Sequence, residues 1–173
     1  MYLAPANAQR FIQGYTLAML EVLGEQKDGI PGSVVPLLAK ARAKFIRKPT
    51  LLHQAIARLK ARNVRLDPEV VTAIERLEVR QWVYLRDTTR HSIMIDSAAD
   101  RAFGVLGLTQ GIRDITGGTG VIIEAGVVRY HGQYVCDGII SEVVWLGSGY
   151  RRSWNDTFRE IKSSGRFYVK AEV

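Results

Sequence analysis

The first part of the chain places apolar residues at the spacing of an α-helix. In residues 7–23 they recur three and four apart and would share one face: Phe11, Tyr15, Ala18, Met19 and Val22. Asn7 is a suitable N-cap, and Gly24 is a natural stop. Segment 25–32 is rich in Gly and Pro and predicts a loop. The same periodicity, with Pro49 and Asp67-Pro68 as boundary signals, predicts further helices near 36–48, 51–62 and 68–78.

From about Val79 the apolar period changes to two, which is typical of strands. The strongest β pattern spans 121–146 and contains His131-Gly132, so it predicts a hairpin with a two-residue turn. Gly126 and Gly138 lie on either side of that turn and would let both arms bend, as in a small barrel. The other predicted elements are strands at 81–86, 91–96, 102–108 and 166–171, a turn-rich loop at 111–120, and a helix near 154–163 with Ser153 and Asp156 as a capping box.

These patterns predict an α+β protein in which an N-terminal four-helix segment packs on a C-terminal bent antiparallel β-sheet or small β-barrel. The predicted division is 1–78 and 79–173. Residues 77–83 (LEVRQWV) are neither Gly/Pro-rich nor polar, so no linker separates the halves. This indicates that the two halves share one core.

Composition favours an ordinary globular protein over a disulfide-rich or membrane-spanning one. The chain has 173 residues, of which 47% are hydrophobic and 24% charged, as in ordinary globular domains. Its single cysteine, Cys136, excludes an internal disulfide and suits a reducing compartment. The first residues lack the pattern of a signal peptide, and no stretch approaches the ~18 apolar residues of a membrane span. We therefore expect a cytoplasmic protein with no membrane partner.

The charge is distributed unevenly along the chain. The net charge is +7, yet residues 29–66 alone contain nine Lys or Arg and no acid. On the second predicted helix four cations fall in one arc, opposite an apolar arc, and form a basic ridge: Lys40, Lys44, Arg47 and Lys48. Arg42 projects toward the apolar side, where it would snorkel or find a carboxylate. The ridge would suit RNA or DNA phosphates, or it is an ordinary solvated face neutralised by the acidic helix 68–78.

A second candidate anion site lies at Gly147–Ser153. Gly147 and Gly149 form a bend, Arg151 and Arg152 supply guanidinium groups, and Ser153 would begin a helix, so free amides and cations could converge there. The alternative is a solvent loop whose arginines pair with nearby acids. Aromatic residues accompany these arginines, and of them we expect Trp145 to be a core residue.

No motif indicates catalysis, a metal or a cofactor. The segment Thr116–Gly120 resembles a phosphate cradle, but a strand follows it instead of a helix, so we interpret it as a β-turn. His131 and Cys136 are too far apart along a hairpin to form a nucleophile–base pair, and Cys136 is expected in the core. The histidines lack metal-ligand spacing.

Three functional hypotheses follow. The first is a non-enzymatic module that binds an anionic partner, most simply the nucleic-acid backbone, through the basic ridge. The second is an enzyme or small-molecule-binding protein that holds an anionic ligand at Gly147–Ser153. The third is a protein-interaction subunit with an exposed apolar face. The sequence does not indicate an oligomeric state.

Overall fold

The computed structural model describes residues 1–24 and 33–172, so the loop predicted at 25–32 lies outside the described residues. The chain divides into two compact units. The helical unit is Pro5–Arg76, and the barrel unit comprises Met1–Ala4 and Leu77–Val173. No helix among the described residues is both long and apolar enough to cross a bilayer.

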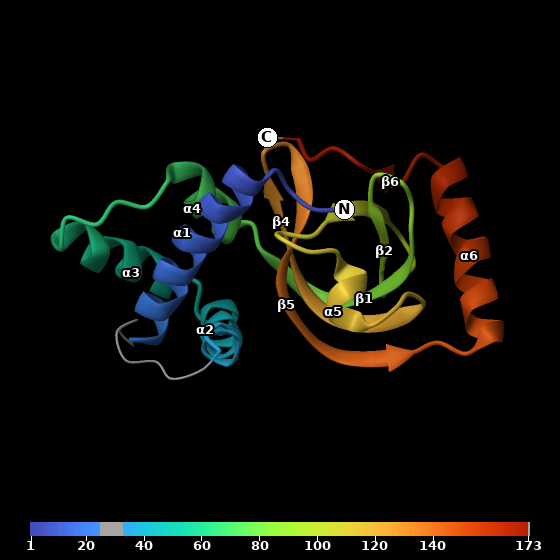
Figure 1. The fold of residues 1–173 in the computed structure, drawn as a ribbon, viewed down its shortest axis with the longest axis horizontal. Helices are drawn as coiled ribbons and strands as arrows, with labels where there is room; N and C mark the ends of the chain where they lie inside the picture. Colours follow the sequence, from blue (N-terminus) through green and yellow to red (C-terminus); the bar gives the residue numbers. More distant parts are fainter. Residues whose placement is uncertain (25–32, 173) are drawn as a thin grey trace. The chain divides into compact units, whose positions relative to one another are not determined.

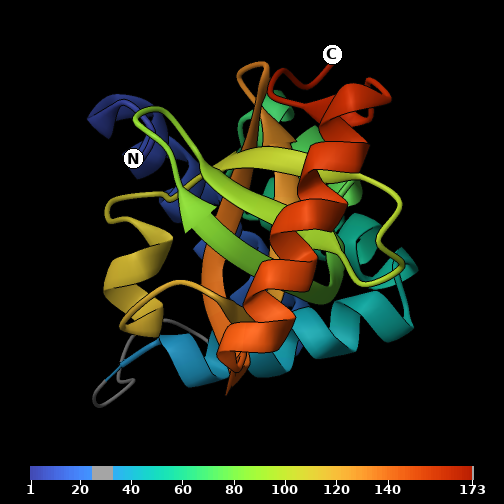
Figure 2. The same cartoon turned by 90° about the vertical axis from the view of Figure 1, so that its right-hand side faces the viewer.

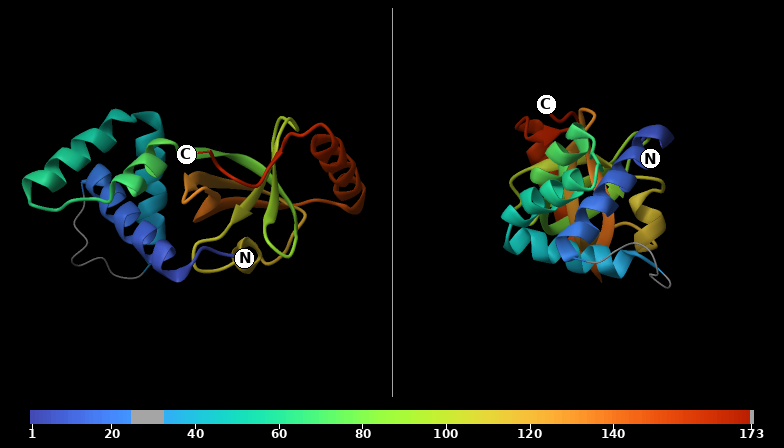
Figure 3. Two further views of the ribbon diagram at one scale, coloured as in Figure 1. Left: turned by 90° about the horizontal axis from the view of Figure 1, so that it is seen from above. Right: turned by 90° about the vertical axis from the view of Figure 1, so that its left-hand side faces the viewer.

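The helical unit contains four helices close to the predicted ranges: α1 (Pro5–Leu23), α2 (Val35–Arg47), α3 (Thr50–Ala61) and α4 (Pro68–Glu75) (Figure 3). Helix α1 packs against the other three, and its predicted apolar face is buried. Gly14 lies at the closest approach of α1 and α4, because a Cβ there would be 2.9 Å from Val70 Cγ1. Asp67 caps α4 as predicted by accepting a hydrogen bond from the Glu69 amide at 2.9 Å.

The barrel unit contains the strands, in the order β1 (Glu78–Asp87), β2 (Ser92–Asp96), β3 (Ala102–Leu106), β4 (Val121–Tyr130), β5 (Gln133–Trp145) and β6 (Phe167–Tyr168) (Figure 1). Two helices interrupt them, α5 (Ile112–Thr116) before β4 and α6 (Ser148–Ser163) after β5. The α+β class and the bent, ring-like sheet are therefore as predicted.

The strand pairings form a closed circuit. β1 pairs with β2 and β4, β5 pairs with β4 and β3, and β2 pairs with β3. The sheet is mixed and not purely antiparallel as predicted, because β3 runs parallel to both β5 and β6. A five-stranded circuit of this order, with a helix between the third and fourth strands, has the connectivity of an OB-fold barrel.

The predicted β4–β5 turn is present. Tyr130 pairs with Gln133, and both turn residues have positive φ, 50° at His131 and 66° at Gly132. Such a two-residue turn matches the twist of the strands that it joins. Cys136 pairs with Val127 and is fully buried, as expected.

Two apolar cores use the two faces of the sheet. The inner core fills the ring and includes Trp82, Tyr84, Met94, Phe103 and Ile123. The outer core lies between α6 and the outward face of β1, β2 and β3, which α6 crosses in Figure 2. Its members include Val83, Ile93, Ile95, Phe158 and Ile161.

Four local predictions need correction. Helix α1 begins at Pro5, so Asn7 lies inside it and is not its N-cap. Helix α6 begins at Ser148, not near 154, so Ser153 lies inside it and does not cap it. The capping box is therefore wrong, and the Asp156 carboxylate instead pairs with Arg159 at 2.7 Å. The loop predicted at 111–120 contains α5, which ends at Gly117 in the left-handed conformation.

Candidate functional site

The basic ridge lies on the exposed face of α2. Lys40, Lys44, Arg47 and Lys48 are all exposed, and the opposite face buries Leu38, Ala41 and Phe45. Lys44 Nζ donates to the carbonyl of Leu23 at 3.3 Å. None of the four ridge cations forms an ion pair with a described residue. The structure thus presents these four side chains together, as the sequence predicts.

The remaining cations of the acid-free segment include several with defined roles inside the helical unit. Arg58 and Arg62 both bind the carboxylate of Glu21 on α1, with Arg58 Nε to Glu21 Oε1 at 2.6 Å. Burial would raise the pKa of Glu21, but the hydrogen bonds and charges of the two arginines lower it overall. Arg42 is only 4% exposed, so it does not reach solvent. Lys60 and Arg65 are exposed beside Ile56 and Val64 in a shallow hollow.

Neutralisation of the ridge by α4 does not occur through ion pairs among the described residues. The cap Asp67 pairs with Arg10 at 3.6 Å, and Glu75 lies 3.4 Å from His53 on α3. These acids therefore face α1 and α3. The ridge is left as a stripe of like charges, and like charges four residues apart destabilise a helix by roughly 0.2–0.5 kcal/mol per pair.

The Gly147–Ser153 segment forms the start of α6. Gly147 is the N-cap residue, and its carbonyl accepts from the Arg151 amide at 2.9 Å. Arg151 and Arg152 line a surface hollow of about 750 Å³, whose other lining residues are Leu146, Ser148, Asn155, Asp156 and Arg159. Gly149 and Ser153 do not line it. The structure therefore brings the two predicted arginines together and adds Arg159, which the sequence did not single out.

Trp145 is not a core residue, contrary to expectation. It is 57% exposed at the end of β5, and Tyr150 in the first turn of α6 is 72% exposed. A β-bulge explains the error, because β5 changes register opposite β4 and Glu142 takes a positive φ of 53°. All residues of β5 from Ser141 to Trp145, at the bulge and after it, are exposed.

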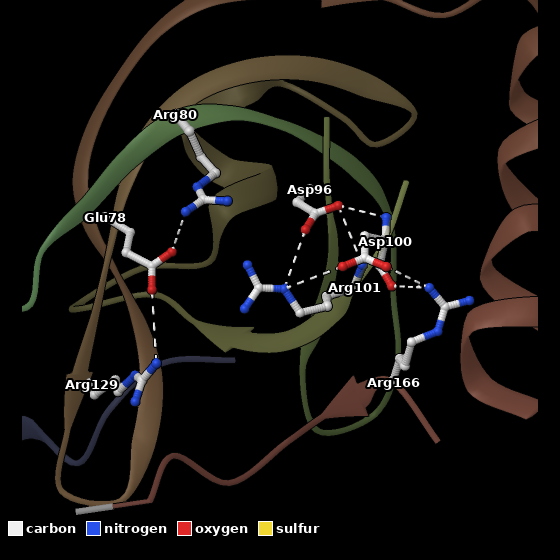
Figure 4. A network of polar contacts seen from close by, with 7 residues as sticks. All are labelled: Glu78, Arg80, Asp96, Asp100, Arg101, Arg129 and Arg166. Carbon is white, nitrogen blue, oxygen red and sulfur yellow. Dashed lines mark hydrogen bonds and ion pairs between the residues drawn. The ribbon is translucent and has the colours of Figure 1, made fainter. Parts of the chain in front are cut away.

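A second set of charges closes one end of the barrel (Figure 4). Glu78 pairs with Arg80 at 2.5 Å and with Arg129 at 3.9 Å. On the other side Asp100 binds Arg166 at 2.7 Å, and Arg101 lies 3.6 Å from Asp96. The sequence alone does not predict this network, although Glu78 and Arg80 continue the inward alternation that includes Trp82 and Tyr84.

The arginines of this network also cover the aromatic core. The Arg80 guanidinium lies 5.3 Å from the Trp82 ring, and that of Arg101 lies 5.8 Å from Phe103. Below them, burial raises the pKa of Tyr134, while Arg129 acts in the opposite direction. Since each carboxylate in the network is matched to an arginine, we interpret it as a structural seal of the ring.

Two buried aspartates of the barrel unit have structural roles. The buried Asp137 accepts hydrogen bonds from the amides of Gly126 and Ile139, at 3.3 and 3.1 Å. Asp96 is also buried and accepts from the Asp100 amide at 2.8 Å. Within residues 1–24 and 33–172, no three His, Cys, Asp or Glu side chains group as metal ligands would.

Barrels of this connectivity can bind oligonucleotides on the face of their second and third strands. In this chain α6 covers that face, with Phe158 and Ile161 packed over Ile93 and Ile95. The connectivity therefore says nothing by itself about function. Comparison with protein-family models, with curated proteins and with solved structures finds no match to this chain.

Proposed function

We propose that the protein is a non-enzymatic module that binds the phosphate backbone of nucleic acid through the basic ridge of α2. The observation that supports the proposal is the contrast within one charged segment. Arg58 and Arg62 are held by Glu21, whereas the four ridge cations are exposed and form no ion pair with a described residue. Unpaired cations in a row are suited to phosphates.

The helical unit carries most of the charge that would attract such a partner. Pro5–Arg76 contains twelve Lys or Arg and six Asp or Glu, so it contributes +6 of the net +7. Along α2, Lys40 and Lys44 are one turn apart, a rise of about 6 Å. The duplex carries phosphates every ~3.4 Å along each strand, so successive ridge cations can each reach a different phosphate.

The experiment is a salt titration of binding to duplex DNA of mixed sequence. If all four ridge cations contact phosphates, log K falls against log salt with a slope near −3.6, which is about a hundredfold loss of affinity between 50 and 200 mM salt. The K40Q/K48Q variant should lower the steepness of that slope by about 1.8. Weak dependence on salt would contradict the proposal.

A matched variant distinguishes the effect of the ridge on binding from the effect of net charge. The substitutions K60Q and R65Q also remove two exposed cations from the acid-free segment, but on and after α3. We expect K60Q/R65Q to retain the wild-type slope. An equal loss in both variants would show that only overall charge matters and would remove the ridge as a site.

A further inference from the structure

The Gly117–Gly120 turn holds two side chains from distant parts of the barrel unit. The Trp145 indole rests on Gly118, where a Cβ would lie 2.7 Å from ring atom Cη2. Arg151 Nη2 donates to the Thr119 carbonyl at 2.9 Å, and a Cβ at Gly120 would lie 2.3 Å from Arg151 Nε. The glycines thus leave room for an aromatic ring and a guanidinium on one turn.

Regular structure fixes the backbone at both residues, and the turn supports their side chains. Trp145 pairs with Val121 at the end of β5, and the Leu146 amide donates to Gly120 at 2.9 Å. Arg151 lies in the first turn of α6, whose middle is held by the Arg86–Asn155 hydrogen bond at 2.9 Å. The indole and the guanidinium are therefore positioned before any ligand arrives, which reduces the entropy lost on binding.

The end of β5 and the start of α6 carry exposed aromatic area and unmatched charge. Trp145 and Tyr150 are the two most exposed large aromatic side chains among the described residues. Three arginines line the adjoining hollow, and its one carboxylate, Asp156, is bound by Arg159. Arg152 makes no hydrogen bond or ion pair with a described residue.

We infer that this surface binds single-stranded nucleic acid, with unpaired bases stacked on Trp145 and Tyr150 and phosphates at Arg151 and Arg152. Small anions would use the arginines but leave the aromatic rings in water. A duplex would do the same, because its bases are stacked on one another. Among nucleic acids, only a single strand offers free base faces and phosphates together. The inference goes beyond the proposed function, since it rests on different residues in a different unit.

The test compares a base-containing strand with its backbone alone. The probes are an oligothymidylate and an oligouridylate of about 10 nucleotides, within the usual site size, and an abasic oligomer of the same length. We expect both base-containing strands to quench tryptophan fluorescence and to bind at least ~10-fold more tightly than the abasic oligomer. Trp145 is the exposed reporter, whereas Trp82 is buried.

Two substitutions locate the site. W145A should weaken binding of the oligothymidylate roughly 10-fold or more while leaving the abasic oligomer unchanged. Y150A should act in the same direction, and because Tyr150 is so exposed this variant keeps the test valid if W145A does not fold. Equal binding of abasic and base-containing strands, or wild-type affinity in both variants, would overturn the inference.

Matched controls guard against indirect effects. Tyr168 is a partly exposed aromatic residue on β6, paired with the start of β3 at the other end of the barrel, so Y168A should bind as the wild type does. For charge, R152Q should weaken binding of both oligomers, whereas K162Q in the last turn of α6 should not. Failure of the α2 ridge proposal would appear instead as weak salt dependence of binding to duplex DNA, while W145A and Y150A would still bind the oligothymidylate more weakly than the wild type does.

Discussion

The Arg58 side chain binds both the carboxylate and the backbone carbonyl of Glu21. Arg58 Nε donates to Glu21 Oε1 at 2.6 Å, and Nη2 donates to the Glu21 carbonyl at 2.8 Å. Arg62 binds the other carboxylate oxygen. One acid near the end of α1 therefore fixes α3 and neutralises two of the cations that would otherwise extend the basic surface.

This arrangement gives the helical unit an acid-sensitive contact. The pKa of Glu21 is lowered in the folded protein from its ordinary 4.5. Its ionised form therefore stabilises the fold above that value, and the contribution is lost as pH falls through the lower folded-state pKa. In E21Q we expect a loss of about 1 kcal/mol at neutral pH and a shallower decline of Tm below pH ~4.5, measured by circular dichroism. If Tm declined equally at acidic pH in E21Q and in the wild type, the pKa of Glu21 would not change on unfolding.

The close contact of α1 and α4 should limit substitution at Gly14. An alanine Cβ would lie 2.9 Å from Val70 Cγ1, and overpacking of this kind costs about 1–3 kcal/mol. The gain in helix propensity, about 1 kcal/mol, offsets part of that cost. We expect G14A to lower the free energy of unfolding, and V70A to cost less in the G14A background than alone. A simple sum of the two effects in urea denaturation would argue against contact.

The β2–β3 turn contains a residue in a strained conformation. Ala99 has φ 57° and its amide donates to the Asp96 carbonyl at 2.9 Å. Since this region costs an L-residue roughly 1–2 kcal/mol, A99G should stabilise the barrel unit by about 1 kcal/mol. The neighbouring A98G is the control, because Ala98 has no positive φ and glycine there should destabilise slightly. The same sign for both changes would contradict the explanation.

Two glycines of the barrel should respond differently to alanine. At Gly118 the added Cβ would meet the outer edge of the exposed Trp145 ring and push the ring toward solvent, so G118A should change stability little but weaken binding of the oligothymidylate. At Gly126 the Cβ would lie 2.3 Å from the buried Asp137 Oδ2 and 2.8 Å from Leu77 Cδ1. G126A should therefore lower Tm strongly. Thermal denaturation of both variants, beside the binding assay for G118A, checks this contrast.

The sequence predicted the elements that local signals define. Periodicity located α1 to α4, and the His131-Gly132 pair located the β4–β5 turn. What it could not supply are pairings between distant residues, such as the parallel contact of Ala102 with Phe167. The glycines also gave a wrong signal, because Gly147 and Gly149 are typical of a loop although α6 begins between them.

The candidate sites likewise divide into features that local sequence predicts and features that depend on distant residues. The ridge was predictable because Lys40 and Lys44 share a helix face. The exposure of Trp145 was not, because the end of β5 leaves the core on both faces at a bulge that has no sequence signal. The charge network at the barrel end was missed for a related reason, since Glu78 and Arg129 are brought together only by the closure of the ring.

The residues that precede α1 belong to the barrel unit. The Leu3 amide donates to the Gly107 carbonyl at 3.0 Å, so the chain leaves the barrel unit after Ala4 and returns to it at Leu77. The helical unit is therefore held by two covalent tethers. A cut in either connection would therefore leave the helical unit covalently joined to the barrel unit through the other connection.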